Sequence, residues 1–221
     1  MQYTEIAVAV IHELYKNKRI VHRDIGLHNL TYYKSEEGLL VAMLIDYSHA
    51  MVPTLQEGSS SDYRSVNFPF TSWEILENPL LEHTLRHDLE SLLYCALFYG
   101  VGYRQGKDFP RRKKARRAKQ PKRTEKADDD HLAAWRFGAD RDVAESKKMF
   151  IIAPPLFNRR LLLVTDVNIY QFCAGMLEVF REASVMSTDG TIAVTYTQLM
   201  RELGQPTFSC EHTCCVAEIL D

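Results

Sequence analysis

The sequence contains no apolar run that approaches about 20 residues, the length that a helix needs to cross a membrane. It also lacks an N-terminal succession of basic, apolar and small residues of the kind that marks a secretory signal. The formal net charge of -2 gives no overall attraction to nucleic acid or to a membrane surface. We therefore expect an intracellular protein, cytoplasmic or nuclear, that has no membrane partner.

No CxxC pair is present among the cysteines, and their number is odd. The 5 cysteines leave one unpaired in any full pairing, which fits a reducing compartment. Four potential zinc ligands crowd the C-terminus, namely Cys210, His212, Cys214 and Cys215. Because their spacing matches no standard zinc site and a second ligand pair is missing, we expect no metal there.

The composition is that of a folded chain. With 221 residues, 46% of them hydrophobic and 25% charged, the chain is long enough for one well-buried domain or two small ones. An aromatic content of 10% argues against wholesale disorder. No internal repeat is apparent.

The most specific pattern is a short polar loop, residues 21–29, which reads Val-His-Arg-Asp-Ile-Gly-Leu-His-Asn. It contains Asp24 and Asn29, and a second carboxylate, Asp46, ends the apolar run 39–45. A single Asp in a loop is usually a turn residue or a helix cap. In this order, however, one Asp can accept a hydroxyl proton while an Asn and another Asp hold magnesium against the phosphates of a nucleotide. The spacing therefore favours phosphoryl transfer.

The flanking segments predict how these residues come together. Apolar residues at helical spacing over 1–18 predict an amphipathic helix that leads directly into the loop. Two apolar runs, 30–33 and 39–45, are separated by the turn-like residues 35–38 and predict a hairpin. Such a hairpin would return Asp46 to the side of Asn29. We expect a mainly α-helical fold with one small β-hairpin.

Further along the chain, helical patterns alternate with polar segments. Residues 47–72 are expected to form an exposed loop, and 87–99 a buried helix that stops at Gly100. The block 111–123 reads RRKKARRAKQPKR and is expected to be a mobile insertion, with a nuclear-import signal or an RNA-binding patch as the alternative. Because no aromatic residues interleave with these charges, nucleic-acid binding is not favoured. Further helical segments are expected at 132–137, 143–152, 161–164, 170–181 and 196–203.

These motifs resemble the fungal-type protein kinase-like family, a divergent branch of the eukaryotic protein kinase fold. The resemblance rests on the segments 21–29, 44–46, 70–76 and 87–91, together with Trp135 and the later Lys147-Lys148-Phe150. It spans roughly residues 5–180.

The resemblance implies roles for the residues of the polar loop. Asp24 would be the catalytic base, and Asn29 and Asp46 would be the magnesium ligands beside bound ATP. Arg23 would form an ion pair with a phosphorylated activation loop, for example with a phosphate on one of Ser59–Ser61. Such a phosphate carries a charge of about -1.5 to -2, which suits a guanidinium. The substrate implied is a protein with a Ser or Thr hydroxyl as acceptor.

Three more residues have structural roles by the same resemblance. His22 belongs to the loop motif. Glu74 would pair with an Arg of the lobe, the alternative being a solvated residue in the first turn of a helix. Asp88 would hydrogen-bond the backbone of the catalytic loop, the alternative being an ordinary helix cap.

The sequence departs from the family pattern in several places. Gly26 replaces the lysine that Ser/Thr kinases carry two positions after the catalytic Asp, and Ser48 replaces the glycine of Asp-Phe-Gly. No GxGxxG occurs, and the few residues ahead of Asp24 leave no room for a phosphate loop, a strand lysine and a helix glutamate. We therefore expect a C-terminal lobe without its N-terminal lobe, with residues 1–180 as the lobe, 107–130 as an insertion and 181–221 as an extension.

Such a chain would be a truncated gene product, a fragment completed by a partner that supplies or covers the missing lobe's face, or a pseudokinase remnant. Three functions remain open: an ATP- and Mg²⁺-dependent protein kinase-like phosphotransferase of the Ser/Thr type, a non-catalytic pseudokinase-type binding module, and a small-molecule kinase of the aminoglycoside-phosphotransferase type. The last class favours His-Gly-Asp where this chain has Arg23, which argues against it.

Overall fold

The structure is a computed structural model of the 221-residue chain. It describes residues 2–34, 36, 40–52, 69–103, 132–153, 158, 160–164, 166–186, 199 and 201. Several expectations from the sequence lie outside these residues: the basic block 111–123, the serines 59–61, the cluster of zinc-type residues near the C-terminus and most of the expected helix 196–203.

Helix α1, Gln2–Lys18, leads into the polar loop, and the hairpin follows directly. The strands are β1, Leu30–Lys34, and β2, Leu40–Leu44, which pair in antiparallel fashion with Leu30 opposite Leu44. Lys16 and Lys18 lie in the last turn of α1, where the negative end of the helix dipole favours cations. The predictions of an N-terminal helix and a hairpin are confirmed.

Helix α3, Leu85–Tyr103, is longer than the sequence indicates. The prediction that Gly100 ends this helix is wrong, because the helix continues through it. A Cβ atom at Gly100 would lie 2.8 Å from the Cγ1 of Val164. The glycine therefore permits a close approach between α3 and a neighbouring segment inside the helix, instead of terminating it.

The remaining elements are the 3₁₀ turn η1 (Tyr47–His49), α2 (Trp73–Glu77), α4 (Ala133–Phe137), α5 (Asp140–Ile152), the 3₁₀ turn η5 (Leu161–Leu163) and α6 (Val167–Met186). The helical segments expected at 132–137, 143–152, 161–164 and 170–181 are present with shifted ends, whereas η1, which lies inside the expected loop 47–72, and α2 were not predicted. The prediction of a mainly helical chain with one two-stranded antiparallel hairpin is confirmed within the described residues.

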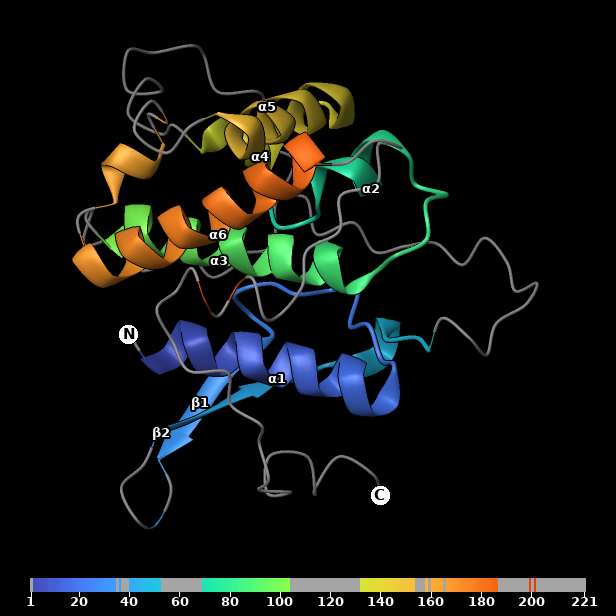
Figure 1. The fold of residues 1–221 in the computed structure, drawn as a ribbon, viewed down its shortest axis with the longest axis vertical. Helices are drawn as coiled ribbons and strands as arrows, with labels where there is room; N and C mark the ends of the chain where they lie inside the picture. Colours follow the sequence, from blue (N-terminus) through green and yellow to red (C-terminus); the bar gives the residue numbers. More distant parts are fainter. Residues whose placement is uncertain are drawn as a thin grey trace, which may run out of the picture.

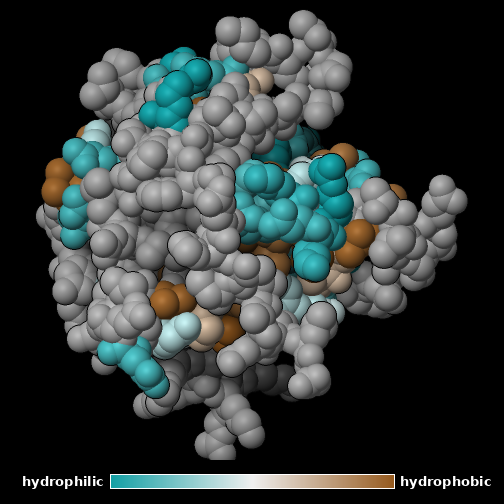
Figure 2. Space-filling model, turned by 60° about the horizontal axis from the view of Figure 1, so that its bottom comes forward, coloured by the Kyte–Doolittle hydropathy of each residue, from teal (hydrophilic) through white to brown (hydrophobic). Residues whose placement is uncertain are grey.

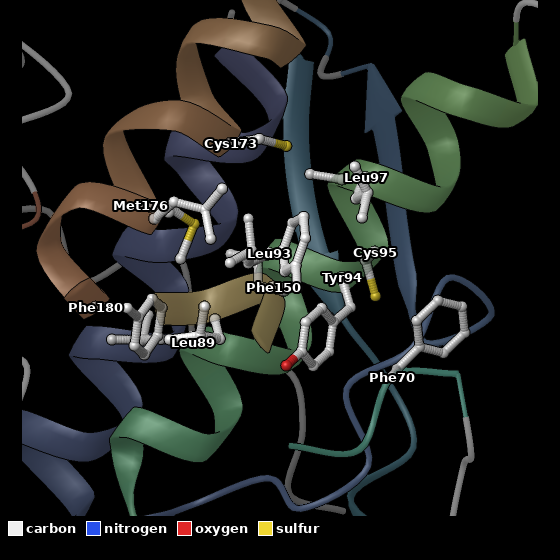
Figure 3. Packing of buried hydrophobic residues seen from close by; sticks show 14 of the residues in the cluster. Phe70, Leu89, Leu93, Tyr94, Cys95, Leu97, Phe150, Cys173, Met176 and Phe180 are labelled. Atoms are coloured by element: carbon white, nitrogen blue, oxygen red, sulfur yellow. The ribbon is translucent and has the colours of Figure 1, made fainter. Parts of the chain in front are cut away.

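The elements stack in layers around α3 (Figure 1). The hairpin packs against α1, α1 packs against α3, and α6 lies along the other side of α3 with α5 beyond it. The core fills the space between these helices, and Figure 3 shows Leu89 and Leu93 of α3 near Met176 and Phe180 of α6. Tyr94 lies between Phe70 and Phe150 in the same view. Helix α3 is thus the central element from which the polar loop is supported.

The surface of the described residues is mixed. In the view of Figure 2, hydrophobic residues appear at separate places among hydrophilic ones. On the hairpin, Tyr32, Tyr33, Met43 and Ile45 are exposed. No helix in the described part of the chain combines the length and apolarity required to span a membrane.

Candidate functional site: a polar loop supported by buried charges

The polar loop is folded around Asn29. Its Nδ2 donates to the backbone carbonyl of Asp24 at 2.8 Å and to the Asp24 carboxylate oxygen Oδ2 at 3.1 Å. Because both partners can only accept, the amide group must face Asp24, and its Oδ1 points away. Asp24 is 8% exposed, and its other oxygen, Oδ1, is buried without a hydrogen-bond partner in the described chain. A buried carboxylate oxygen without a partner is costly unless a ligand or substrate uses it.

His22 connects this loop to the end of the hairpin. Its Nδ1 accepts the backbone N–H of Asp24 at 3.4 Å, so the proton of the neutral ring is on Nε2, which donates to the carbonyl of Ile45 at 3.1 Å. The ring also packs edge-on against Tyr47, with centroids 4.8 Å apart. Burial lowers the pKa of His22, which keeps the ring neutral in this arrangement.

Asp46 lies next to this contact. The backbone N–H of Ile45 donates to the backbone carbonyl of Asn29 at 3.0 Å. Asp46 therefore follows directly after the residue that pairs with Asn29. The carboxylates of Asp24 and Asp46 both raise the pKa of His22, although less than burial lowers it. An isolated antiparallel β-bridge between Val21 and Met51 joins the two ends of the segment 22–50. The expected hairpin geometry thus brings Asp46 to the Asn29 end of the loop.

Asp46 itself is exposed, and only one of its carboxylate oxygens is engaged. Oδ1 accepts from the hydroxyl of Ser48 at 2.7 Å and from its backbone N–H at 3.3 Å. These two hydrogen bonds lower the pKa of Asp46. Asp46 and Arg23 both adopt the left-handed backbone region, with φ of 63° and 70°. This conformation is strained for residues other than glycine and is concentrated at functional sites.

Asp88 of α3 restrains the backbone of the polar loop through hydrogen bonds. Its carboxylate accepts the backbone N–H groups of His22, at 2.7 Å, and Arg23, at 3.0 Å, and pairs with His83 at 2.9 Å. Burial raises the pKa of Asp88, but His83 and the two backbone donors outweigh it, and the net pKa is lowered. Because α3 begins at Leu85, Asp88 lies inside the helix and its carboxylate reaches the loop across the interface.

Glu74 lies at the start of α2 and contacts two residues from the first turn of α3. Arg86 Nη1 donates to Glu74 Oε2 in a short ion pair, and His87 Nε2 lies 3.0 Å from the same oxygen. The N–H of Thr84 donates to His87 Nδ1, which leaves the ring proton on Nε2 facing Glu74. Burial lowers the pKa of His87. The arginine that the sequence left unnamed as partner of Glu74 is thus Arg86.

Glu90 is the centre of the same buried group and was not singled out by sequence reasoning. It is 0% exposed, and its Oε1 accepts the N–H of Trp73 at 2.8 Å and the hydroxyl of Tyr94 at 2.5 Å. Its Oε2 lies 3.1 Å from Arg86 Nη2, an ion-pair distance without hydrogen-bond alignment. Glu90 thereby fastens the start of α2 to α3.

Lys147 of α5 completes the group. Its Nζ donates to the carbonyl of Thr71 at 2.5 Å and lies 4.4 Å from the centroid of the Tyr94 ring. Burial lowers the pKa of Lys147 to about 7, although Glu90 and Cys95 oppose this shift. We call Glu74, Arg86, Glu90 and Lys147 the buried charge cluster. The sequence signal for Lys147 was the family-like Lys147-Lys148-Phe150, whereas Glu90 and Arg86 gave none of their own.

The oxygen atoms of the loop that accept no hydrogen bond are of the chemical type that a hard cation prefers. Asp24 Oδ1, Asn29 Oδ1 and Asp46 Oδ2 accept no hydrogen bond within the described part of the chain. Carboxylate and amide oxygens are the protein ligands that Mg²⁺ prefers. No group of three or more His, Cys, Asp or Glu residues that suits a metal is found among the described residues, so any ion here would depend on the Asn29 amide and on oxygens supplied by a ligand.

Arg23 and Gly26 are the other two loop residues to which the sequence drew attention. Within the described residues the Arg23 guanidinium makes no ion pair, and the serines proposed as its phosphorylated partners lie outside them. Gly26 is buried, and its carbonyl accepts the N–H groups of Asn29 and Leu30 at the turn.

The fold and the loop are compatible with a protein kinase-like protein. Residues 4–99 match the family described as fungal protein kinase, and this segment contains every site residue named from the sequence. The resemblance inferred from the motifs is confirmed over this segment, while α4, α5 and α6 lie beyond it. A comparison with curated proteins gives no match.

Proposed function

We propose that this chain carries the catalytic loop and the metal-binding residues of a phosphotransferase that uses ATP and Mg²⁺ and acts on Ser or Thr hydroxyls of proteins. The observation that carries this proposal is the polar loop itself. The buried Asp24 carboxylate has one oxygen without a partner, and its other oxygen accepts from the Asn29 amide. The hairpin carries a second carboxylate, Asp46, directly after Ile45, whose backbone N–H donates to Asn29. The family match over residues 4–99 supports kinase-like chemistry in general.

Each residue would have a distinct task in this reaction. Asp24 Oδ1 would accept the proton of the substrate's Ser or Thr hydroxyl. The hydroxyl oxygen would then bond to the terminal phosphorus of ATP as the bond from that phosphorus to the departing nucleoside diphosphate breaks. Asn29 and Asp46 would hold Mg²⁺ through oxygen atoms. When bound, the ion would supply charge neutralisation at the phosphates.

The surrounding contacts would keep these groups in position. Asn29 holds Oδ2 of Asp24 at 3.1 Å, so the carboxylate cannot rotate freely. Asp88 fixes the backbone on the N-terminal side of Asp24 through two hydrogen bonds. Preorganisation of this kind is a large part of what a phosphotransferase contributes, because the protein does little covalent chemistry itself.

The first experiment is Mg²⁺-dependent nucleotide binding by thermal shift on the 221-residue chain, followed by transfer of labelled phosphate to a Ser/Thr-containing protein such as casein. We expect a rise in melting temperature that requires both ATP and Mg²⁺. Asp24→Asn should abolish transfer, whereas Asp142→Asn, at an exposed position of α5, should leave it unchanged.

The alternatives give different results in the same experiment. A chain that shows no nucleotide-dependent shift at saturating ATP is a binding module of the pseudokinase type, and the proposal is then wrong. Transfer to aminoglycosides but not to protein would assign the chain to the small-molecule kinases.

A further inference from the structure

A histidine side chain, His28, lies close to the Asp24 carboxylate. His28 Nε2 lies 3.9 Å from Asp24 Oδ2, and among the described residues no other Lys, Arg or His side chain forms an ion pair with this carboxylate. The two side chains are one helical turn apart in sequence, and the turn at 27–29 places them on the same side of the loop. His28 has no part in the roles assigned above.

The imidazole of His28 is open to a ligand. Its side chain is 58% exposed, whereas that of Asp24 is 9% exposed. The distance of 3.9 Å is too long for a hydrogen bond, and His28 makes no hydrogen bond within the described part of the chain. The ring is therefore exposed next to the Asp24 oxygen that Asn29 already binds, and its N–H is available to a ligand.

A hydrogen-bond donor beside Asp24 would offset the repulsion between its carboxylate and a phosphoryl group. A phosphoryl group that approaches Asp24 brings negative charge toward a carboxylate, and the repulsion between them must be offset by donors or cations. Position 26, which lies between Asp24 and His28, has no side chain. The Arg23 backbone N–H donates to Asp88, and the Arg23 guanidinium makes no ion pair with Asp24 among the described residues.

We propose that His28 is a further catalytic residue, whose imidazole N–H contacts the phosphoryl group at Asp24. This inference rests on the proposed function and deepens it, because it assigns a hydrogen-bond donor to the phosphoryl group that approaches Asp24. The ligand class is a phosphate monoester or the terminal phosphate of a nucleotide. Either neutral tautomer or the protonated ring can donate through one nitrogen, so the contact does not depend on one protonation state.

The test is a series at position 28 with a readout that does not need turnover. Binding of inorganic phosphate in the presence of Mg²⁺ is measured by ³¹P NMR line broadening, and binding of ADP with Mg²⁺ is measured in parallel by thermal shift. His28→Ala should weaken phosphate binding by about 10-fold, the effect of one hydrogen bond to a charged group. His28→Lys should remain within about 3-fold of the parent, and His28→Glu should bind less than His28→Ala because of charge repulsion.

Arg141→Gln is the matched control for loss of a basic side chain, because Arg141 is exposed on α5 and belongs to neither part of the site. In the transfer assay, His28→Ala should lower kcat more than it raises KM for the protein substrate, and His28→Lys should restore kcat.

The outcomes separate this inference from the proposed function. If the parent transfers phosphate, Asp24→Asn does not, and all three His28 variants behave like the parent, then the function stands and the role of His28 is wrong. If His28→Ala and His28→Lys are equally impaired, the side chain acts through its shape and the donor role is overturned. If the parent binds neither phosphate nor nucleotide, both proposals fail.

Discussion

The polar loop and the buried charge cluster are both built from charged side chains, but they differ in how the charges are compensated. Atoms without a hydrogen bond occur in both regions, but in the cluster Glu90 Oε2 and Arg86 Nη2 lie 3.1 Å apart as an ion pair of opposite charge. In the loop, Asp24, Asn29 and Asp46 each keep one oxygen without a partner. In the cluster, Glu90 accepts two hydrogen bonds and lies beside Arg86, while Lys147 donates to Thr71. The loop therefore leaves oxygen atoms available, whereas the cluster joins α2, α3 and α5.

The difference shows how a fold can support unsatisfied groups. Leaving a buried carboxylate oxygen without a partner costs free energy, and so does a left-handed backbone at Arg23 and Asp46. These costs persist only where surrounding contacts fix the backbone. Asp88 provides that restraint at the loop, and α3 carries both Asp88 and Glu90. The same helix therefore serves both regions.

The largest effect on folding is expected from Glu90→Ala in the buried charge cluster. It removes one of the two carboxylates that pair with the buried Arg86, and with it the acceptor of the Trp73 N–H and the Tyr94 hydroxyl. The free energy of unfolding should fall by about 3–5 kcal/mol in urea denaturation. Glu178→Ala, which breaks the partly exposed pair with Arg181 on α6, should cost less than about 1 kcal/mol. Equal losses in both variants would contradict the distinction between buried and exposed pairs.

A smaller loss of stability, but a larger local effect on the loop, is expected from Asp88→Ala. The free energy of unfolding should fall by about 3 kcal/mol, because two backbone donors and His83 lose their charged acceptor. Hydrogen exchange at the amides of His22 and Arg23 should accelerate, while exchange within α6 should follow only the global change. If these two amides stay protected, Asp88 does not restrain the loop.

Gly100→Ala tests the close approach of α3 to Val164. A Cβ at 2.8 Å from Val164 Cγ1 cannot be accommodated without a shift, and we expect a loss of about 2 kcal/mol. Thermal or urea unfolding measures this loss. Adding Val164→Ala to Gly100→Ala should recover part of it, although that second change also empties a buried site. A Gly100→Ala variant more stable than the parent would mean that helix propensity outweighs the contact.

The smallest effect concerns pH. Burial lowers the pKa of His22 and His87 below the ordinary value of 6.5. Below pH 6.5 the unfolded chain binds protons that the folded chain does not, so the free energy of unfolding decreases as the pH falls toward the folded pKa values. Urea midpoints at pH 7.5, 6.5 and 5.5 measure this decrease. His87→Gln should show a shallower dependence, and a midpoint that is constant across this range would rule out the buried neutral histidines.

The local elements were predictable from the sequence because their signals are local. The periodicity of residues 1–18 and the two apolar runs around residues 35–38 determine α1 and the hairpin. The contact between Asp88 and the loop backbone was inferred from a resemblance to known kinases, since no periodicity places residue 88 next to residue 22. The roles of the loop residues in catalysis remain predictions.

The features that sequence analysis missed depend on contacts between distant segments. Gly100 has the residue type of a helix stop, and only the packing of Val164 explains why the helix continues. Glu90 has the pattern of a solvated residue near the start of a helix, yet it is fully buried because Trp73, Tyr94 and Arg86 surround it. Single-residue propensities carry no information about such partners.

The bridge between Val21 and Met51 has a consequence for the thermodynamics of ligand binding. It closes residues 22–50 into a loop whose two ends are joined by reciprocal backbone hydrogen bonds. The entropy of bringing Asp24 and Asp46 together is therefore lost when the chain folds rather than when a ligand arrives. Calorimetry of nucleotide binding should accordingly show little of the entropic penalty that accompanies the ordering of a flexible segment.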